Sequence, residues 1–306
     1  MDFKEEFKKY TAYADQIVTS YLPEEEGFQK IIMDSSNYSV RNGGKRLRPM
    51  LMMLSYELVK KAKEGLYPEG GELSEEDLTV IGPFMAAIEM IHCSSLVHDD
   101  LPCMDNDTLR RGKPSTWAKF GEDIGTLAGD ALMLYAFETA AKSTGNPKRV
   151  IEAMSVLANK SGIYGMVGGQ TVDVCLTGKR PTRKELVYIY QNKTGALLEL
   201  SFMAGAILAG AGKRQAEALR KAALSVGLAF QIRDDILDVI STESELGKPI
   251  GSDEASGKVT WLTYYGMEKS VKDVEKYTEE AVAAVERFSG NEFLERLIRY
   301  LAERKN

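Results

Sequence analysis

Two clusters of aspartates and arginines carry the residues in this sequence best suited to chemistry. The first reads Asp99-Asp100-Leu101-Pro102-Cys103-Met104-Asp105, and Asp107, Arg110 and Arg111 follow it. It comes directly after an apolar segment, so its carboxylates end a helix that we expect to be buried, where an unpaired charge is costly. Pro102 disfavours helical geometry at the residue before it. We therefore expect the chain to leave the helix there, which lets Asp105 turn back toward Asp99.

The second cluster runs from Phe230 to Asp238, and Asp234 and Asp238 share one helix face because they are four residues apart. Two largely apolar helices thus each deliver an Asp-Asp pair. If both pairs face one cavity, their carboxylates are ligands for hard divalent cations. Mg²⁺ is typically held by one or two carboxylates together with waters and substrate phosphates. Neither cluster has the glycine and terminal glutamate spacing of a Ca²⁺ loop.

Cationic partners for a diphosphate stand in the turn Gly43–Pro49, which reads Gly-Gly-Lys-Arg-Leu-Arg-Pro. Glycines allow close backbone approach, and lysine and arginine side chains suit phosphate. A basic loop at the start of a helix explains this turn equally well when it is taken alone. Lys193, Lys248 and Lys258 are further candidates, although exposed lysines are common.

The elements that must position these residues are helices, because apolar residues recur at spacings of three and four along most of the chain. The pattern predicts helices over residues 84–98, 128–141, 150–163, 184–208, 214–239 and 271–288. Alternating β-branched runs are almost absent, so we expect no substantial sheet. No loop is long or biased enough to be an interdomain linker. We predict one all-α domain over residues 1–306 with about ten helices.

Composition excludes several classes of protein. The chain has 306 residues, 44% hydrophobic and 27% charged, which is ordinary folded-protein usage and not that of a disordered, collagen-like or coiled-coil chain. Its net charge of −6 argues against general nucleic-acid binding. The most apolar stretch, Ala196–Gly212, contains Glu199 and three glycines, so we expect a buried helix there and no membrane span.

The three cysteines predict a reducing compartment. Cys93, Cys103 and Cys175 are widely spaced, without the rhythm of a metal site or a disulfide framework. The N-terminal residues are charged and show no apolar signal core. We therefore expect a cytoplasmic protein with reduced thiols.

Taken together, these motifs resemble the trans-isoprenyl diphosphate synthases, or polyprenyl synthetases, and most closely their bacterial short-chain branch of farnesyl and geranylgeranyl diphosphate synthases. The resemblance covers residues 38–258 in the family's order and spacing. It implies a single-domain, all-helical bundle of the isoprenoid-synthase type around a central cavity, and a homodimer. The matching segments are Gly43–Pro49, His92, the run HDDLPCMDNDTLRRGKPS from His98, Gly168–Asp173, Lys193–Gly195 and FQIRDDILD from Phe230.

The resemblance implies a role for each matching residue. Two Mg²⁺ ions are expected on Asp99 and Asp105 and a third on Asp234. Neighbouring carboxylates act indirectly: Asp100, Asp235 and Asp238. The allylic diphosphate is expected to contact Arg110, Lys193, Thr194, Gln231, Lys248 and Lys258. Isopentenyl diphosphate is expected on Gly44, Lys45, Arg48, His92 and Arg111. The catalytic group comprises Asp99, Asp100, Asp105, Arg110, Lys193, Asp234 and Lys258.

The chemistry that the resemblance implies explains this concentration of charge. Diphosphate leaves only if its developing charge is neutralised, which is what metal ions, lysines and arginines supply. The double bond of isopentenyl diphosphate then attacks the allylic cation, and the released diphosphate takes the proton. The Phe230 ring is a candidate to shield the cation, but a role as a core aromatic residue explains it at least as well. Gln170 and Asp173 are expected to brace the metal site. The glycines Gly168 and Gly169 are expected to allow close helix packing. His98 matches the motif, but we derive no role for it.

Small residues before the first aspartate bear on product length. Many farnesyl synthases carry an aromatic residue five positions upstream, where this chain has Ser94, followed by Ser95. A small pocket floor favours longer products unless Met90, Ile91 or another side chain closes it. We expect isopentenyl diphosphate to be condensed with dimethylallyl or geranyl diphosphate to farnesyl diphosphate, with geranylgeranyl diphosphate as the nearest alternative.

Three other interpretations remain open from the sequence. A terpene cyclase shares the metal-assisted ionisation but holds no isopentenyl diphosphate, which leaves the basic turn unexplained. A noncatalytic subunit of a prenyltransferase heterodimer is expected to have lost an Asp motif, and both are intact here. A generic acidic cation-binding module leaves the paired arginines and the glycine turn without a role. Thr108 stands where relatives commonly have another aspartate, and Ser115–Trp117 replaces the commoner Thr-Asn-His.

Overall fold

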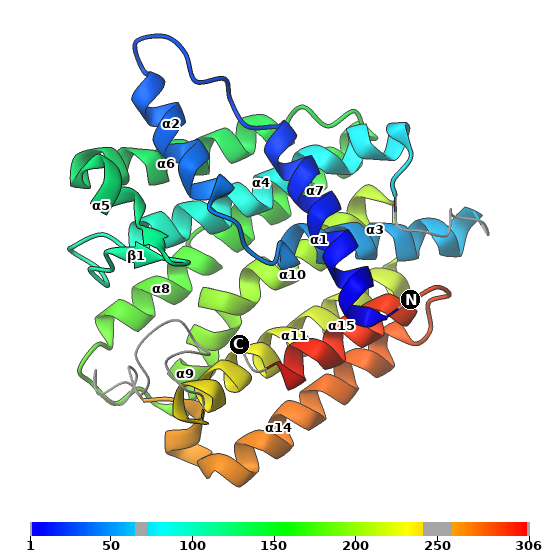
Figure 1. Ribbon diagram of the computed structural model, residues 1–306. Helices are drawn as coiled ribbons and strands as arrows, with labels where there is room; N and C mark the ends of the chain where they lie inside the picture. The colour runs from blue at the N-terminus through cyan, green and yellow to red at the C-terminus, as the bar shows by residue number, and fades with distance from the viewer. Residues whose placement is uncertain (1, 65–71, 241–258, 305–306) are drawn as a thin grey trace. The chain divides into compact units, whose positions relative to one another are not determined.

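The computed structural model describes residues 2–64, 72–240 and 259–304, and over these residues the regular secondary structure is almost entirely helical (Figure 1). This confirms the all-α prediction. The two strands, β1 (Leu109–Arg110) and β2 (Lys113–Pro114), form one short antiparallel hairpin. The helices are α1 (Phe3–Ser20), α2 (Lys30–Arg41), α3 (Leu47–Glu64), α4 (Glu75–Asp99), α5 (Thr116–Phe120), α6 (Glu122–Ala140), α7 (Pro147–Ser161), α8 (Met166–Cys175), α9 (Arg183–Ile189), η1 (Tyr190–Thr194), α10 (Gly195–Leu208), α11 (Lys213–Ile240), α14 (Trp261–Val285) and α15 (Glu292–Glu303).

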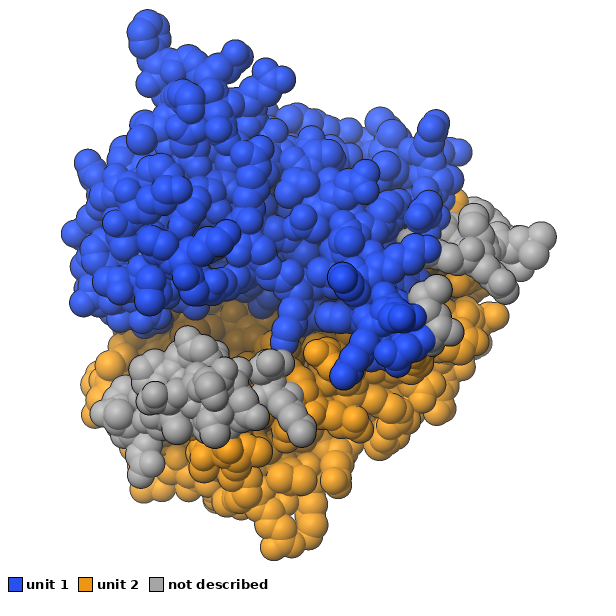
Figure 2. Space-filling model, in the orientation of Figure 1, with its two compact units in different colours: residues 1–53, 68–154 blue, residues 54–67, 155–306 orange. Residues whose placement is uncertain are grey.

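Contacts within the chain group the residues into two compact units, which Figure 2 shows in different colours. Unit 1 comprises residues 1–53 and 68–154, and unit 2 comprises residues 54–67 and 155–306. The single domain over residues 1–306 stays a prediction.

Helix α4 is the core of unit 1. Its start is capped by Ser74, whose hydroxyl accepts a hydrogen bond from the Asp77 backbone N–H. From Ile81 to Ile91 every side chain is buried, so the helix has no polar face to turn toward water and must be surrounded. Helices α1, α2 and α6 pack against it. Among the residues described, α4 alone is long and apolar enough to cross a membrane, but 78% of that window is buried inside the protein, as in a core helix.

Helices α10, α11 and α14 form the centre of unit 2. All but one of the residues of α10 are buried, and α11 packs against both α10 and α14. The sequence predicts one helix over residues 184–208. The chain is helical throughout that range, but five residues, Tyr190–Thr194, form a π-helix between α9 and α10. This wider turn carries two of the predicted site residues, Lys193 and Thr194.

Candidate active site

The first acidic motif begins where α4 ends. Asp99 is the last residue of the helix, and the Asp105 backbone N–H donates a hydrogen bond to the Asp99 carbonyl over 2.9 Å. The predicted return of Asp105 toward Asp99 is therefore confirmed. Trp117 braces the same loop, because its indole N–H donates to the Asp107 carbonyl over 2.9 Å. Sequence reasoning had assigned Trp117 no role.

Asp100 and Arg110 form an ion pair beside this loop. Asp100 is only 2% exposed, and the Nε of Arg110 donates to its Oδ1 over 3.0 Å. Burial raises the pKa of Asp100 despite this pairing, and Asp100 in turn raises the pKa of Arg110 against the effect of burial. Arg110 also lies 3.6 Å from the Asp107 carboxylate. The arginine that the family resemblance assigns to the allylic diphosphate is thus held in place by the motif's own acids.

The glycine turn and the β1–β2 hairpin are joined directly. The Arg111 guanidinium donates to the Gly43 carbonyl, and the Asn42 side chain donates to the Arg110 carbonyl over 3.1 Å. Gly44 has a φ of +131°, and a Cβ at that position would lie 2.9 Å from the Arg111 guanidinium carbon. Only glycine fits there. Gly44 and Arg111, both predicted for isopentenyl diphosphate, therefore lie together.

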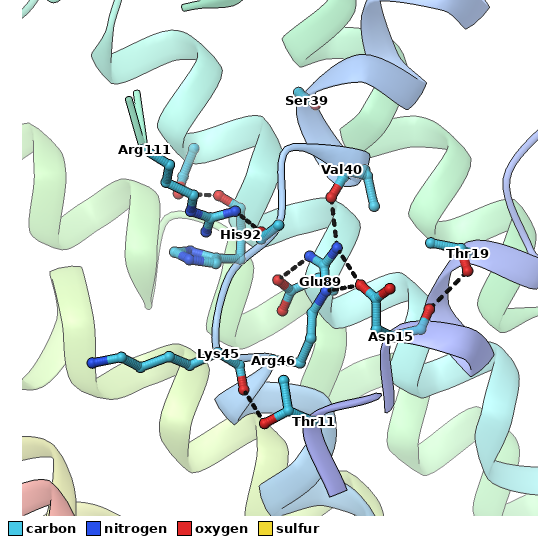
Figure 3. Close-up of polar contacts among 12 residues, drawn as sticks. Thr11, Asp15, Thr19, Ser39, Val40, Lys45, Arg46, Glu89, His92 and Arg111 are labelled. Atoms are coloured by element: carbon cyan, nitrogen blue, oxygen red, sulfur yellow. Dashed lines mark hydrogen bonds and ion pairs between the residues drawn. The ribbon is translucent and has the colours of Figure 1, made fainter. Parts of the chain in front are cut away.

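His92 lies among the same cations. Desolvation of its ring, together with Arg48 and Arg111, lowers the pKa of His92 well below the usual 6.5. Figure 3 shows Arg111 beside His92 and the Lys45 side chain extending away from Arg46. At neutral pH this His is uncharged, with one N–H to donate. Unit 1 thus brings together a neutral His and several arginines, a combination suited to a diphosphate.

The two serines before the motif differ in their surroundings. Ser94 is fully buried, and its hydroxyl donates to the Gly129 carbonyl on α6 over 2.8 Å. Ser95 is half-buried, and its hydroxyl donates within α4 to the His92 carbonyl. The ring of His98 packs against α6 so closely that a Cβ on Gly129 would lie 2.1 Å from its Nε2. His98 therefore has a packing role, and the chain-length role of the serines stays a prediction.

In unit 2, the second acidic motif is held by residues distant in sequence. Asp234 accepts a hydrogen bond from Arg304, which is 8% exposed and also donates to the Phe230 carbonyl over 3.2 Å. The guanidinium carbon of Arg304 lies 3.6 Å from the centre of the Phe230 ring, a cation–π contact. The role of Arg304 was not predicted from the sequence, because nothing in the motif indicates a partner 70 residues away.

Asp235 is buried at the centre of a polar network. It accepts hydrogen bonds from the Tyr190 hydroxyl and, over 2.9 Å, from the Trp261 backbone N–H. Gln231 donates to its other oxygen over 3.4 Å, and the Thr194 hydroxyl donates to Gln231 over 2.8 Å. The structure therefore brings together two residues predicted for the allylic diphosphate, Thr194 and Gln231. Asp238, one turn beyond Asp234, is buried as well.

Lys193 lies in the π-helix against α8. Its ammonium donates to the Asp173 carboxylate over 2.6 Å. A Cβ on Gly169 would lie 2.1 Å from the Lys193 backbone nitrogen, and one on Gly168 would lie 2.1 Å from the Ile163 carbonyl oxygen. The predicted helix-packing role is confirmed for Gly169, whereas Gly168 makes room for the turn that precedes its own helix. Gln170 lies on α8, half-buried, and Lys248 and Lys258 lie outside the described residues.

The donor set decides which metal ions the residues can accept. In the part of the chain that the structure describes, no three His, Cys, Asp or Glu side chains gather as a protein-only metal site. Asp99 and Asp105 offer two carboxylates from backbone positions that one hydrogen bond joins. Mg²⁺ commonly takes one or two protein carboxylates and completes its shell with water and phosphate, so the pair fits Mg²⁺ in kind. Of the residues in the two motifs, only Cys103 has a thiol that could act as a soft ligand, and it is exposed on the loop.

Comparison with known proteins identifies the family. Residues 29–301 match the family model described as polyprenyl synthetase. The chain is 44% identical over 258 residues to a geranylgeranyl diphosphate synthase of Cyanophora paradoxa, covering 83% of this chain and 81% of the relative. It superposes on the geranylgeranyl pyrophosphate synthetase of Pyrococcus horikoshii with a TM-score of 0.85 and 28% identity, covering 99% of this chain and 100% of that one.

A second solved structure is similar to the same extent. The FPP/GFPP synthase of Zymomonas mobilis gives a TM-score of 0.82 at 32% identity, over 98% of both chains. The family match over residues 29–301 spans both acidic motifs and the glycine turn. The chain belongs to the polyprenyl synthetase family and is a prenyltransferase that elongates prenyl chains.

Proposed function

We propose that this enzyme condenses isopentenyl diphosphate head-to-tail with allylic diphosphates and that its product is geranylgeranyl diphosphate. The observation that carries the condensation is the contact of Arg111 with the glycine turn beside His92, because it builds a cationic site next to the acidic motif. A terpene cyclase has no second diphosphate to place there. The sequence put farnesyl diphosphate first, but the relatives named geranylgeranyl diphosphate synthases favour the longer product.

In this proposal isopentenyl diphosphate binds in unit 1. Lys45, Arg48 and Arg111 neutralise its charge, and the Gly44 backbone allows close approach. His92 donates its ring N–H without adding charge, since its pKa lies well below neutrality. Preformed donors of this kind hold the nucleophile in place and cost little reorganisation when the reaction occurs.

The allylic diphosphate ionises against the acidic motifs. Asp99, Asp105 and Asp234 would hold Mg²⁺, which when bound neutralises the charge that develops on the leaving diphosphate. The family resemblance assigns four further residues to the same diphosphate: Arg110, Lys193, Thr194 and Gln231. Asp100 positions Arg110, and Asp173 positions Lys193, through the ion pairs described above. Lys248 and Lys258 are assigned the same substrate by the family resemblance.

The test is product analysis by mass spectrometry, with purified protein, isopentenyl diphosphate and each of dimethylallyl, geranyl and farnesyl diphosphate, with and without Mg²⁺. We expect geranylgeranyl diphosphate as the endpoint from every starter, and only with Mg²⁺. A farnesyl endpoint would refute the proposed product and leave the condensation intact. No condensation product from any starter would refute the condensation and favour a noncatalytic subunit.

We further propose a homodimer formed through α6. Leu127 and Leu134 lie seven residues apart on one helix face and are 52% and 72% exposed. Large apolar side chains exposed on one face of a helix are typical of interaction surfaces. Light scattering should show a dimer for the wild type and a monomer for Leu134→Asp. The control is Leu109→Asp, which should stay dimeric: Leu109 is 62% exposed but does not lie on α6.

A further inference from the structure

Arg46 is a charged residue of the basic turn that phosphate binding does not explain. It stands between Lys45 and Arg48, but its side chain has no exposed surface. Its φ is +49°, in the left-handed region that residues with a side chain seldom adopt. Such a conformation persists only where the surroundings hold it.

Three helices of unit 1 hold the Arg46 guanidinium (Figure 3). Its Nε donates to Asp15 of α1 over 2.8 Å, and its Nη1 donates to Glu89 of α4 over 2.8 Å. Its Nη2 donates to the Val40 carbonyl of α2 over 2.6 Å. Glu89 is 2% exposed, so the Arg46–Glu89 pair is buried on both sides.

The same cluster fixes the backbone around the predicted phosphate ligands. The Arg46 carbonyl accepts from the Met50 N–H over 3.1 Å at the start of α3, the helix that carries Arg48. The Lys45 carbonyl accepts from the Thr11 hydroxyl over 3.5 Å. Glu89 lies three residues before His92 on α4, and residues at this spacing are neighbours on one helix face. Figure 3 shows the Lys45 side chain pointing away from this cluster.

We propose that Arg46 is a positioning residue for isopentenyl diphosphate: its buried ion pair with Glu89 holds the turn so that Lys45, Arg48 and His92 form one preformed site. Arg46 itself does not touch the diphosphate. Glu89 and Asp15 balance its charge, so Arg46 holds the turn in place and does not itself attract the diphosphate. This inference rests on the proposed isopentenyl diphosphate site.

The experiment replaces the pair and not one member, because removing one partner leaves a buried charge that endangers folding, whereas apolar replacement of both is often neutral. In Arg46→Met/Glu89→Met we expect the Kd and KM for isopentenyl diphosphate to rise by about tenfold to a hundredfold, the penalty of a misplaced binding group. The KM for the allylic substrate and the melting temperature should stay near wild type. Arg46→Lys, which keeps the charge without the planar fork, should give a smaller rise.

The matched control is Lys160→Met/Glu199→Met, which removes a 2.6 Å ion pair of unit 2 and should leave the Kd for isopentenyl diphosphate unchanged. An unchanged Kd in Arg46→Met/Glu89→Met would overturn the inference. So would a loss spread equally over both substrates and the melting temperature, which marks a purely structural pair. Lys45→Ala distinguishes a failure of this inference from a failure of the proposed isopentenyl diphosphate site. If it weakens isopentenyl diphosphate binding and the Arg46 pair does not, only the inference fails. If Lys45→Ala has no effect, the proposed site is wrong and the inference falls with it.

Discussion

The two acidic motifs are held in place by different means. In the first, Asp100 pairs with Arg110 only ten residues away, and Asp105 turns back to Asp99. In the second, Asp234 pairs with Arg304, and Asp235 with Tyr190, which are 70 and 45 residues away. The first motif is therefore a local loop that carries its own counter-charges, and the second is assembled by the packing of unit 2. Similar chemistry in the two motifs does not require similar construction.

The largest expected effect is a loss of kcat, and we expect it to be the same for both motifs. Asp99→Ala and Asp234→Ala should each lower kcat by about 10³-fold, because each removes a carboxylate that stabilises charge in the transition state. Steady-state kinetics at saturating substrate measures this, with circular dichroism confirming that each variant is folded. A kcat near wild type in either variant would remove that residue from the proposed metal site.

Stability should separate the motifs. Asp235→Asn leaves Tyr190, Gln231 and the Trp261 N–H to share one acceptor oxygen in a buried network, so we expect a loss of about 1–3 kcal/mol in the free energy of unfolding. Asp107→Asn, in an exposed part of the first motif, should change it by less than about 0.5 kcal/mol. Urea denaturation gives both values. Equal losses would contradict the distinction between a packed motif and a local loop.

The helix leading into the first motif allows a sharper test of product length. Ser94→Phe forces an aromatic ring into the α4–α6 contact and should cost about 1–3 kcal/mol of stability through overpacking. Ser95→Phe has more room and should shorten the main product with a smaller loss. Product analysis and thermal melts of both variants measure this, with Ser95→Ala as the control of unchanged product. If Ser95→Phe yields the wild-type product, Ser95 does not limit chain length.

The smallest effect concerns pH and the cations beside the first motif. The folded-state pKa of His92 is lowered below the usual 6.5, so between these two values the unfolded chain binds more protons than the folded one. Stability should therefore be full above pH 6.5 and fall as the pH drops below it, by at most about 1.4 kcal/mol per pH unit for this one proton. His92→Gln should remove that slope, which urea denaturation at several pH values tests. An unchanged slope would mean that other groups cause it.

Much of the architecture follows from residue patterns. The helical period predicted α7 and α11 close to their observed bounds, since a buried helix requires apolar residues on that period. It also predicted α4 and α6, but α4 begins nine residues and α6 six residues before the predicted start. Six described helices lay outside the predicted ranges: α1, α2, α3, α5, α8 and α15. The π-helix at Tyr190–Thr194 was also missed, because its residues differ little from those of an α-helix.

What the sequence by itself determined is the chemistry and the local bends. The residue types of the Asp motifs indicated a diphosphate and hard cations, and Pro102 predicted the turn that returns Asp105 to Asp99, because a proline restricts the backbone of its own neighbour. Tertiary structure alone decided which charges meet. Arg46 points inward while its neighbour Lys45 points outward, and Arg304 reaches Asp234, because buried charges take the partners that distant helices bring within hydrogen-bond distance.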